Sequence, residues 1–411
     1  MSVAGSVLPE EVLATSLELL EDLCAISSAS GEVGGLYAVA ERLGAELTSL
    51  GMVPETHAEG GIDGTAQPVL VASGPGVGDG YTLLLAHLDT VLPAVPPQRD
   101  GERLIATGAL DMKGGLTAFV GALRALRARG EAPPENLVLV AVPDEEIGGP
   151  ISVRAVRHWG ERAHTVLVLE PGARRGDHET LVTGRRGLTT WRLDARGTAA
   201  HSGVAYWDGR SALAAAATWA GAVQRMSEEG DGPIVNVGRI VGGDSEFVSD
   251  VGEEHRFIGT SERLNIVADR CLVEGEVRYL QPEDRDRFLF RMRDLAESLA
   301  RGWGVDLELR ELEHIPPMAL SEASAGLAAH LVQAARADGW TLELEPNRGG
   351  VSFPNFLPDP AAVCVVDGLG PVGGGMHTRQ EHLDIESLRR RIALIAEALV
   401  YVRDRAGEGH R

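Results

Sequence analysis

The chain has 411 residues, enough for two domains or for one large domain with an insertion. Its formal net charge of −22 argues against nucleic acid and anionic membranes as partners. The sequence contains no run of about 18 consecutive apolar residues, so we expect no membrane span. The N-terminus lacks the basic start and the apolar stretch of a signal peptide. Cys24, Cys271 and Cys364 lie far apart without metal-type spacing, so we expect reduced, buried thiols in a cytoplasmic protein.

The first half of the chain alternates between predicted helices and short apolar strands. The helices are expected at about 9–27 and 35–51 and at Gly115–Arg129 and Ile151–Trp159. The buried strands are expected at Val69–Ala72, Thr82–His87, Leu137–Val142 and Thr165–Glu170. Such alternation is typical of an α/β sheet covered by helices on both faces, where functional sites form at the carboxyl ends of the strands.

From about residue 187 the pattern changes to the order βαββαβ. The strands are expected at Leu188–Gly197, Ile234–Val241, Cys271–Leu280 and Val305–Glu313, and the helices at Arg210–Glu228 and Glu283–Arg301. This order predicts a ferredoxin-like unit at 187–313, inserted between a first part of the main domain, 1–186, and a second part, 314–411, that ends in the helix Ile385–Arg403. The polar stretch 243–263 has neither a helical nor a strand period, so we predict a long loop there.

Five residues of metal-ligand type lie at the ends of predicted strands or in glycine-rich turns: His87, Asp111, Glu146, Glu170 and His377. Two histidines and three carboxylates are enough to hold two zinc-class ions that share one carboxylate. Glu145 lies beside a ligand and has no ligand role left, which makes it a candidate general base. Asp89, two residues after His87, can accept the second imidazole N–H and so orient the ring.

Each of these residues also has a structural interpretation. His87 alone is equally well explained as a histidine at a strand end, and an aspartate before a helix, such as Asp111, is more often an N-cap than a ligand. Asp144, Glu145 and Glu146 would repel one another at a buried strand end unless a cation neutralised them, although a solvated acidic turn is the alternative. The set taken together, in this order, favours metal binding.

Several motifs carry a resemblance to a known family. They are Leu-Ala-His-Leu-Asp at 85–89, Asp-Met-Lys-Gly-Gly at 111–115, Pro-Asp-Glu-Glu at 143–146, Gly-Arg-Arg-Gly at 184–187, Gly-Thr-Ala-Ala-His-Ser-Gly at 197–203 and Gly-Pro-Val-Gly-Gly-Gly-Met-His-Thr at 370–378. Over about residues 10–405 the chain resembles the zinc-dependent exopeptidases and amidohydrolases that include acetylornithine deacetylase, succinyl-diaminopimelate desuccinylase, aminoacylase, peptidase T and glutamate carboxypeptidase. It is most similar to the glutamate carboxypeptidase branch. These motifs are specific for the family and not for a substrate.

The resemblance implies a fold and a metal centre. The fold is a central mixed sheet flanked by helices, with the insertion 187–313 as a lid or dimerisation domain. Two divalent ions would share Asp111. Zn²⁺ is the first candidate, and the ligands also suit Co²⁺ or Mn²⁺. His87 and Glu170 would complete one metal site, and Glu146 and His377 the other.

The resemblance also implies catalytic roles. A hydroxide bridging the two ions would be the nucleophile, and Glu145 would act as general base and then general acid. Asp89 would orient His87. His201, by default a surface or capping residue between two small-residue turns, would reach the active site of a partner subunit and stabilise the oxyanion, which predicts a homodimer.

Four residues are expected to contact the substrate: Asn265, Arg278, Gly350 and Ser352. Arginine suits a planar carboxylate, but a salt bridge to Glu276 or Glu274 is the structural alternative for Arg278. The chain departs from the family in this region: the family usually has Ser/Thr-Asp after Gly-Gly, whereas here Gly349-Gly350 is followed by Val-Ser-Phe-Pro. Phe353 and Pro354 would reshape the wall that meets the substrate's side chain. The identity of the substrate is therefore the least determined part of the prediction.

We expect a hydrolase that cleaves an amide bond next to a free carboxylate in a small substrate, either an N-acyl amino acid or a small dipeptide. Phe353 and Phe356 favour an apolar acyl pocket. The first alternative is a dipeptidase or tripeptidase, which needs a site for a free α-amino group. The second is a non-catalytic, ligand-binding descendant, against which the retained ligands and Glu145 argue.

Overall fold

The computed structural model describes residues 8–78, 80–254 and 265–408, and its contacts divide the chain into two units. Unit 1 consists of Met1–Gly184, Ala319–Arg348 and Ser352–Arg411. Unit 2 consists of Arg185–Met318 and Gly349–Val351. The predicted insertion, 187–313, falls within unit 2, which also takes in Gly349–Val351.

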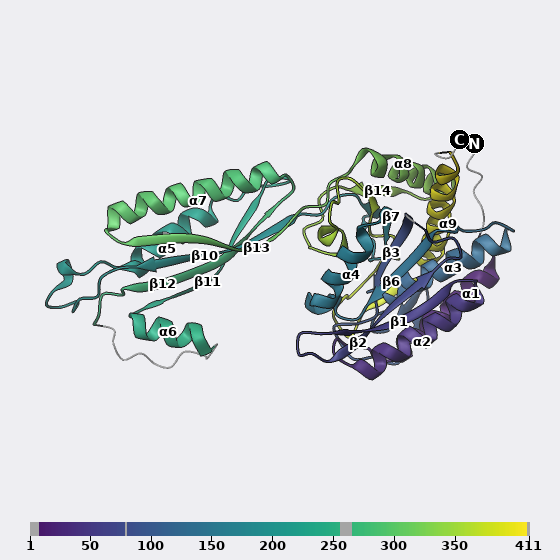
Figure 1. Cartoon of the computed structure of the whole chain (residues 1–411), viewed down its shortest axis with the longest axis horizontal. Coiled ribbons are helices and arrows are strands. Elements are labelled where there is room, and N and C mark those ends of the chain that lie inside the picture. Colours follow the sequence, from purple (N-terminus) through teal and green to yellow (C-terminus); the bar gives the residue numbers. More distant parts are fainter. Residues whose placement is uncertain (1–7, 79, 255–264, 409–411) are drawn as a thin grey trace. The chain divides into compact units, whose positions relative to one another are not determined.

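Unit 1 is built on a six-stranded sheet in the order β1-β2-β6-β3-β7-β15 (Figure 1). Its strands are β1 (Val53–Gly60), β2 (Ala66–Ser73), β3 (Tyr81–His87), β6 (Leu137–Val142), β7 (Ala163–Val168) and β15 (Cys364–Val366). β6, β3, β7 and β15 are parallel, whereas β1 and β2 join antiparallel, so the sheet is mixed. β3 and β6 are buried at every position, which explains their continuous apolar sequences.

Helices flank this sheet, as the sequence predicted, and the expected fold class is confirmed. They are α1 (Glu10–Ala25), α2 (Val33–Ser49), α3 (Lys113–Ala128), α4 (Pro150–Gly160), α8 (Glu322–Ala337) and α9 (Ile385–Glu408). Figure 1 shows α4 on one face of the sheet and α1, α2 and α3 on the other. Across the described ranges, no helix has the length and apolar composition that crossing a bilayer requires.

Two small sheets complete unit 1. One contains β14 (Leu342–Glu345), β9 (His178–Val182) and β8 (Arg174–Arg175), and the other contains β16 (Gly373–Gly374), β17 (His382–Asp384), β5 (Arg103–Ile105) and β4 (Gln98–Asp100). In the second small sheet β17 pairs antiparallel with β5. The segment that leads to Asp111 and the turn that carries His377 are therefore neighbours.

Unit 2 contains a four-stranded antiparallel sheet in the order β11-β12-β10-β13. Its elements in chain order are β10 (Gly187–Arg196), α5 (Ala212–Gln224), β11 (Ile234–Gly243), α6 (Ser245–Glu254), β12 (Arg270–Tyr279), α7 (Pro282–Trp303) and β13 (Asp306–Ile315). With α6 set aside, this is the ferredoxin-like order that the sequence predicted. Trp191 and Trp219 meet edge to face at 5.3 Å between ring centroids in its core, where burial of each ring contributes about 1.5–3 kcal/mol.

The prediction of a loop throughout 243–263 was wrong for its first half, because Ser245–Glu254 form α6. The Asp244 carboxylate accepts a hydrogen bond from the Phe247 amide and caps the helix, and Val248 is buried. The helix packs against β11 and β12. The remainder of the predicted loop, 255–263, lies outside the described residues.

The three cysteines are free thiols, as expected from their spacing. Cys24 and Cys271 are buried, but Cys364 is only half-buried. Burial raises the pKa of Cys24 to about 12 and those of Cys271 and Cys364 to about 11. These side chains are therefore neutral thiols at physiological pH.

Candidate metal centre

Three adjacent parallel strands deliver ligand-type side chains to one edge of the large sheet. His87 is the last residue of β3, Glu145 and Glu146 lie in the 3₁₀ turn η1 (Glu145–Ile147) after β6, and Glu170 follows β7. Because β6, β3 and β7 run parallel, their carboxyl ends meet at the same edge. The strand order thus explains why residues so far apart in the sequence come together.

Two further side chains reach this edge from the second small sheet. Asp111 lies between β5 and α3, and His377 lies in the turn between β16 and β17. His377 has a φ of 62°, a left-handed conformation that is uncommon outside glycine. Gly375 also has a left-handed φ of 69°, and a Cβ at Gly373 would clash with the His382 carbonyl, so these glycines let the turn fold back against β17.

The Asp111 carboxylate lies between the two histidines. Its Oδ1 is 3.1 Å from Nε2 of His87, and its Oδ2 is 3.2 Å from Nε2 of His377. Nε2 of His377 is also 3.3 Å from Oε2 of Glu146. One carboxylate facing two imidazoles through different oxygens is the arrangement that a shared, bridging ligand requires.

Two overlapping groups have ligand atoms within 4.8 Å of one another: His87, Asp111 and Glu146, and His87, Glu145 and Glu170. All five predicted ligands thus belong to these groups or contact them. The second group also includes Glu145, which the sequence analysis assigned as a base and not as a ligand.

The electrostatics of the cluster fit divalent cations. Burial raises the pKa of Glu146 to about 8, and the charges of Asp111 and Glu145 add to that rise while the histidines oppose it. Burial lowers the pKa of His87, but hydrogen bonds to Asp111 and Asp89 outweigh it and raise that pKa well above its ordinary value. Carboxylates crowded in this way are poorly stabilised without positive charge, and mixed imidazole and carboxylate donors suit Zn²⁺, Co²⁺ or Mn²⁺. The residues present therefore fit a pair of divalent ions.

Asp89 connects the end of β3, which carries His87, to the turn η1, which carries Glu145 and Glu146. Its Oδ1 and Oδ2 accept hydrogen bonds from the amides of Glu145 and Glu146, each at 3.2 Å, and Oδ2 accepts another from Ser30 Oγ at 2.7 Å. For Nδ1 of His87 the nearer acceptor is the Asp89 backbone carbonyl at 2.9 Å, with the carboxylate at 3.4 Å. Asp89 thus contacts the imidazole mainly through its backbone and supports the turn through its side chain.

Asp144 has a different role from its two neighbours, and grouping all three as crowded carboxylates was wrong. Its Oδ2 accepts a hydrogen bond from the Ile151 amide at 3.0 Å, and its Oδ1 accepts from the Ser152 amide at 2.8 Å. Ser152 Oγ donates a further hydrogen bond to Oδ1. Asp144 therefore caps the first turn of α4, where the helix dipole also favours a negative charge.

Glu381 was missed in the sequence analysis. Its Oε1 accepts hydrogen bonds from the amides of Leu110 and Asp111, both at 2.9 Å. The residue follows His377 by four positions in a short turn without periodicity, so only its acidic type distinguishes it in the sequence. Burial raises its pKa, and these amide hydrogen bonds oppose that rise.

The predicted substrate residues are divided between the two units. His201 and Asn265, both exposed in unit 2, lie side by side, with Asn265 Nδ2 3.3 Å from His201 Nε2. Arg278, also in unit 2, forms the ion pair with Glu276 that was its structural alternative, through Nε at 3.0 Å and Nη2 at 3.1 Å. The carbonyl of Gly350 accepts a hydrogen bond from Arg185.

In unit 1, Ser352 Oγ donates to Oε1 of Glu170 at 3.3 Å, which places it beside the metal-type cluster. Phe353 begins the short 3₁₀ helix η3 (Phe353–Phe356) and is buried, with its ring centroid 6.4 Å from that of His87. The Phe353 ring thus lies beside the imidazole of the predicted ligand His87. This position weakens the sequence-based argument that Phe353 lines an apolar acyl pocket.

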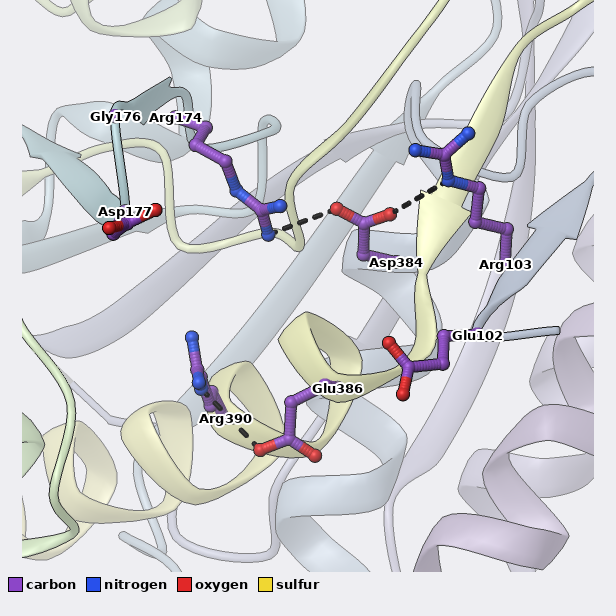
Figure 2. A pocket seen from close by; sticks show the side chains of 8 residues that line it. All are labelled: Glu102, Arg103, Arg174, Gly176, Asp177, Asp384, Glu386 and Arg390. Carbon is purple, nitrogen blue, oxygen red and sulfur yellow. Dashed lines mark ion pairs between the residues drawn. The ribbon is translucent and has the colours of Figure 1, made fainter.

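A pocket of about 320 Å³ elsewhere in unit 1 is lined by charged side chains (Figure 2). Arg103 and Arg174 both pair with Asp384, and Arg390 pairs with Glu386. The lining holds three arginines and four carboxylates, and its arginines are engaged in these ion pairs, so its charge favours no particular ligand.

Comparisons with known proteins assign the chain to a family. The sequence model of peptidase family M20/M25/M40 matches residues 83–401, and the chain belongs to this family. Carboxypeptidase G2 of Pseudomonas sp. (strain RS-16) is 24% identical over 394 residues, which cover 93% of this chain and 88% of that protein. A succinyl-diaminopimelate desuccinylase of Thiobacillus denitrificans is 25% identical over 422 residues, covering 97% and 96%.

Solved structures share the fold. Aminopeptidase PepT from Bacillus cereus superposes with a TM-score of 0.74 at 21% identity, covering 96% of this chain and 99% of that one. The YXEP protein of Bacillus subtilis, described as a dinuclear metal binding peptidase, has a TM-score of 0.65 at 18% identity, with coverage of 96% and 99%. The resemblance inferred from the motifs is confirmed, and the chain is a hydrolase of a metallopeptidase family.

The metal-free protein is expected to lose stability as the pH rises from 6.5 to 9. The pKa of His377 is raised from 6.5 to about 9, chiefly by its hydrogen bond to Asp111, and that of Glu146 is raised from 4.5 to about 8. Across this window the folded chain retains protons that the unfolded chain has released, so a rise in pH favours unfolding. The effect is on the order of 1 kcal/mol, because His377 is half-exposed and solvent screens its interactions.

Calorimetric unfolding in chelator at pH 6.5 and pH 9 measures this loss. Excess Zn²⁺ is the control, since metal binding requires deprotonated ligands and favours the higher pH. A metal-free protein that became more stable toward pH 9 would contradict the prediction.

Proposed function

We propose that the protein is a two-metal hydrolase that cleaves an amide bond next to a free carboxylate, as in carboxypeptidases and N-acyl amino acid deacylases. The observation that carries the proposal is the Asp111 carboxylate between His87 and His377, with further carboxylates within ligand distance. Asp111 would be shared, with His87 and Glu170 completing one metal site. Two bound ions, Zn²⁺ first, would activate a water molecule and polarise the carbonyl of the scissile amide.

Glu145 is proposed as the general base and acid. Its carboxylate lies within 4.8 Å of the ligand atoms of His87 and Glu170, and its backbone amide is held by Asp89. The second ligand, Glu146, follows it directly, and Glu146 with His377 would complete the other metal site. A base attached to a ligand in this way accepts the water proton and returns it to the leaving amine without moving far.

The substrate carboxylate would be bound by Asn265 and Arg278, with Gly350 and Ser352 as further contacts. The names of the relatives support this class, since one is a carboxypeptidase and another removes a succinyl group from diaminopimelate. However, Nε and Nη2 of the Arg278 guanidinium already donate hydrogen bonds to the Glu276 carboxylate. A substrate carboxylate would therefore compete with Glu276 for the guanidinium, which makes the role of Arg278 directly testable.

Glu276→Gln is expected to lower KM severalfold with little change in kcat if Arg278 binds the substrate carboxylate. The change weakens the competing ion pair and leaves the guanidinium in place, and a hydrogen bond to a charged group contributes about 1.5–3 kcal/mol. Steady-state kinetics of this variant and of Arg278→Lys measure the effect. An unchanged KM in both variants would restrict Arg278 to a structural ion pair.

The other roles expected from the resemblance remain part of this proposal: His201 as an oxyanion-stabilising residue acting in a partner subunit, a homodimer, and a cytoplasmic location. The contact between His201 and Asn265 supports a joint role for these two exposed polar residues. Gly203 donates its amide hydrogen to Nδ1 of His201 at 3.1 Å, and the Asn265 amide lies at Nε2, so both ring nitrogens have a polar neighbour within unit 2.

The experiment that tests the function is incubation of Zn²⁺-loaded protein with pooled N-acyl amino acids and dipeptides, followed by mass spectrometry of the products. Release of a free amino acid from N-acyl substrates, or of a C-terminal residue, supports the proposal. Cleavage confined to dipeptides or tripeptides with a free α-amino group would favour the exopeptidase alternative. If nothing is cleaved although two ions are bound, the proposed substrate class is wrong.

A further inference from the structure

Glu381 lies behind the predicted bridging ligand. Glu381 is buried, with 4% of its surface exposed, and its backbone carbonyl accepts a hydrogen bond from the Ala106 amide at 3.1 Å. The next residue, His382, pairs with Ile105 at the start of the β17–β5 ladder. Backbone hydrogen bonds thus connect the turn 377–382 to the segment 105–111.

The Glu381 side chain extends this connection to Asp111 itself. A single oxygen, Oε1, accepts hydrogen bonds from two consecutive amides, Leu110 and Asp111, both at 2.9 Å. Hydrogen bonds to a carboxylate are roughly twice as strong as neutral ones. They hold the peptide from which the Asp111 carboxylate projects toward both histidines.

The same turn also presents His377 to the other side of Asp111. The turn is closed by hydrogen bonds within itself, from Thr378 Oγ1 to the Gly375 carbonyl at 2.6 Å and from the Glu381 amide to the Thr378 carbonyl at 3.2 Å. These hydrogen bonds connect Glu381 to the residues on either side of His377, so a shift of Glu381 is expected to move His377 as well. One turn therefore contacts Asp111 at its backbone through Glu381 and at its Oδ2 through His377.

We propose that Glu381 is a positioning residue for the metal centre: it holds the backbone of Asp111 so that one carboxylate can serve both ions. The inference rests on the proposed two-metal function, and it adds a residue that touches neither substrate nor any predicted ligand atom. Supporting partners of this kind typically change metal affinity by about 10–100-fold when they are removed.

Glu179 offers a matched control in the same unit. It is also a buried carboxylate, but it pairs with Arg391 at 3.0 Å and Arg390 at 3.2 Å and accepts a hydrogen bond from Ser387. A change at Glu179 removes a buried charge from unit 1 without affecting the segment of Asp111. Loss of folding stability alone would affect both positions, whereas loss of metal affinity should be confined to Glu381.

The test is titration of metal-free protein with Zn²⁺ against a chelating dye, with thermal unfolding recorded for each variant. Glu381→Met, which fills the space but offers only an uncharged thioether, a weak hydrogen-bond acceptor, is expected to weaken Zn²⁺ binding about 10–100-fold. Glu381→Gln keeps a carbonyl acceptor and should retain most of the affinity. Glu179→Gln should bind Zn²⁺ like the wild type even where its unfolding temperature falls.

Unchanged Zn²⁺ affinity in Glu381→Met, or an equal loss in Glu179→Gln, would overturn the proposal. If Glu381→Met does not fold, Glu381→Asp, whose carboxylate is one methylene too short to reach both amides, takes its place with the same expected loss. The readout is independent of turnover. A wild-type protein that binds two ions but hydrolyses none of the tested amides would refute the proposed function and leave the inference about Glu381 intact.

Discussion

Glu145→Ala is expected to lower kcat by about 10²–10⁴-fold while two metal ions per chain remain bound. The carboxylate lies within ligand distance of His87 and Glu170, so it is close enough to exchange a proton with water held there. Removing the side chain leaves the hydrogen bond from the residue 145 amide to Asp89 available, because that bond uses the backbone. The metal ligands should therefore keep their positions.

Turnover of the preferred substrate and elemental analysis of the purified variant are the two measurements. Glu145→Gln provides an isosteric comparison, and Glu161→Ala, an exposed position just after α4, controls for loss of a glutamate in the same region. Because Glu145 groups with two ligand-type residues, a fall to one ion per chain would reassign it as a ligand. Substantial residual turnover with two ions bound would refute its role as the base.

Asp111→Asn is expected to weaken the binding of both ions and to reduce turnover by more than about 100-fold, which exceeds the usual effect of a supporting residue. The amide is isosteric but neutral, and it can offer an oxygen to only one of the two positions now faced by Oδ1 and Oδ2. A competition titration with Zn²⁺ measures the affinities. Retention of two tightly bound ions would show that Asp111 is not the shared ligand.

The same variant provides an independent check without metal. The hydrogen bond from Asp111 is the first cause of the raised pKa of His377. In Asp111→Asn the pKa of His377 should therefore fall toward its ordinary value, and the metal-free protein should lose less stability between pH 6.5 and 9 than the wild type. A pH dependence equal to that of the wild type would contradict the assigned contact.

The sheet of unit 1 could be predicted where burial is complete. β3 and β6 are buried at every position and β7 at every position except His164, and a residue of ligand type lies at or shortly after the end of each strand, so both the strands and their functional ends are visible in the sequence. β1 was missed because nearly all of its residues are exposed and its pairing with β2 leaves no apolar pattern. α6 was missed because Val248 is the one buried residue among those whose burial is described there, and because its capping residue, Asp244, resembles an ordinary loop residue.

The candidate site could be predicted to the extent that residue type reveals chemistry. His87, Asp111 and His377 were identified as ligand-type residues, and the structure brings them together. Their supporting contacts could not be predicted, because Glu381 bonds to a segment some 270 positions earlier in the chain. Asp144 was misjudged although its partners are local, because the sequence does not distinguish a carboxylate that caps the next helix from one crowded by its acidic neighbours.

The contacts of Asp89 limit how this centre can change. Its backbone carbonyl meets the imidazole of His87, and its side chain holds the amides of both Glu145 and Glu146. A substitution at this one position would therefore disturb the predicted ligand His87 and the proposed base Glu145 together. Changes of substrate preference must then come from other positions, such as Phe353 and Pro354, which were expected to depart from the family pattern.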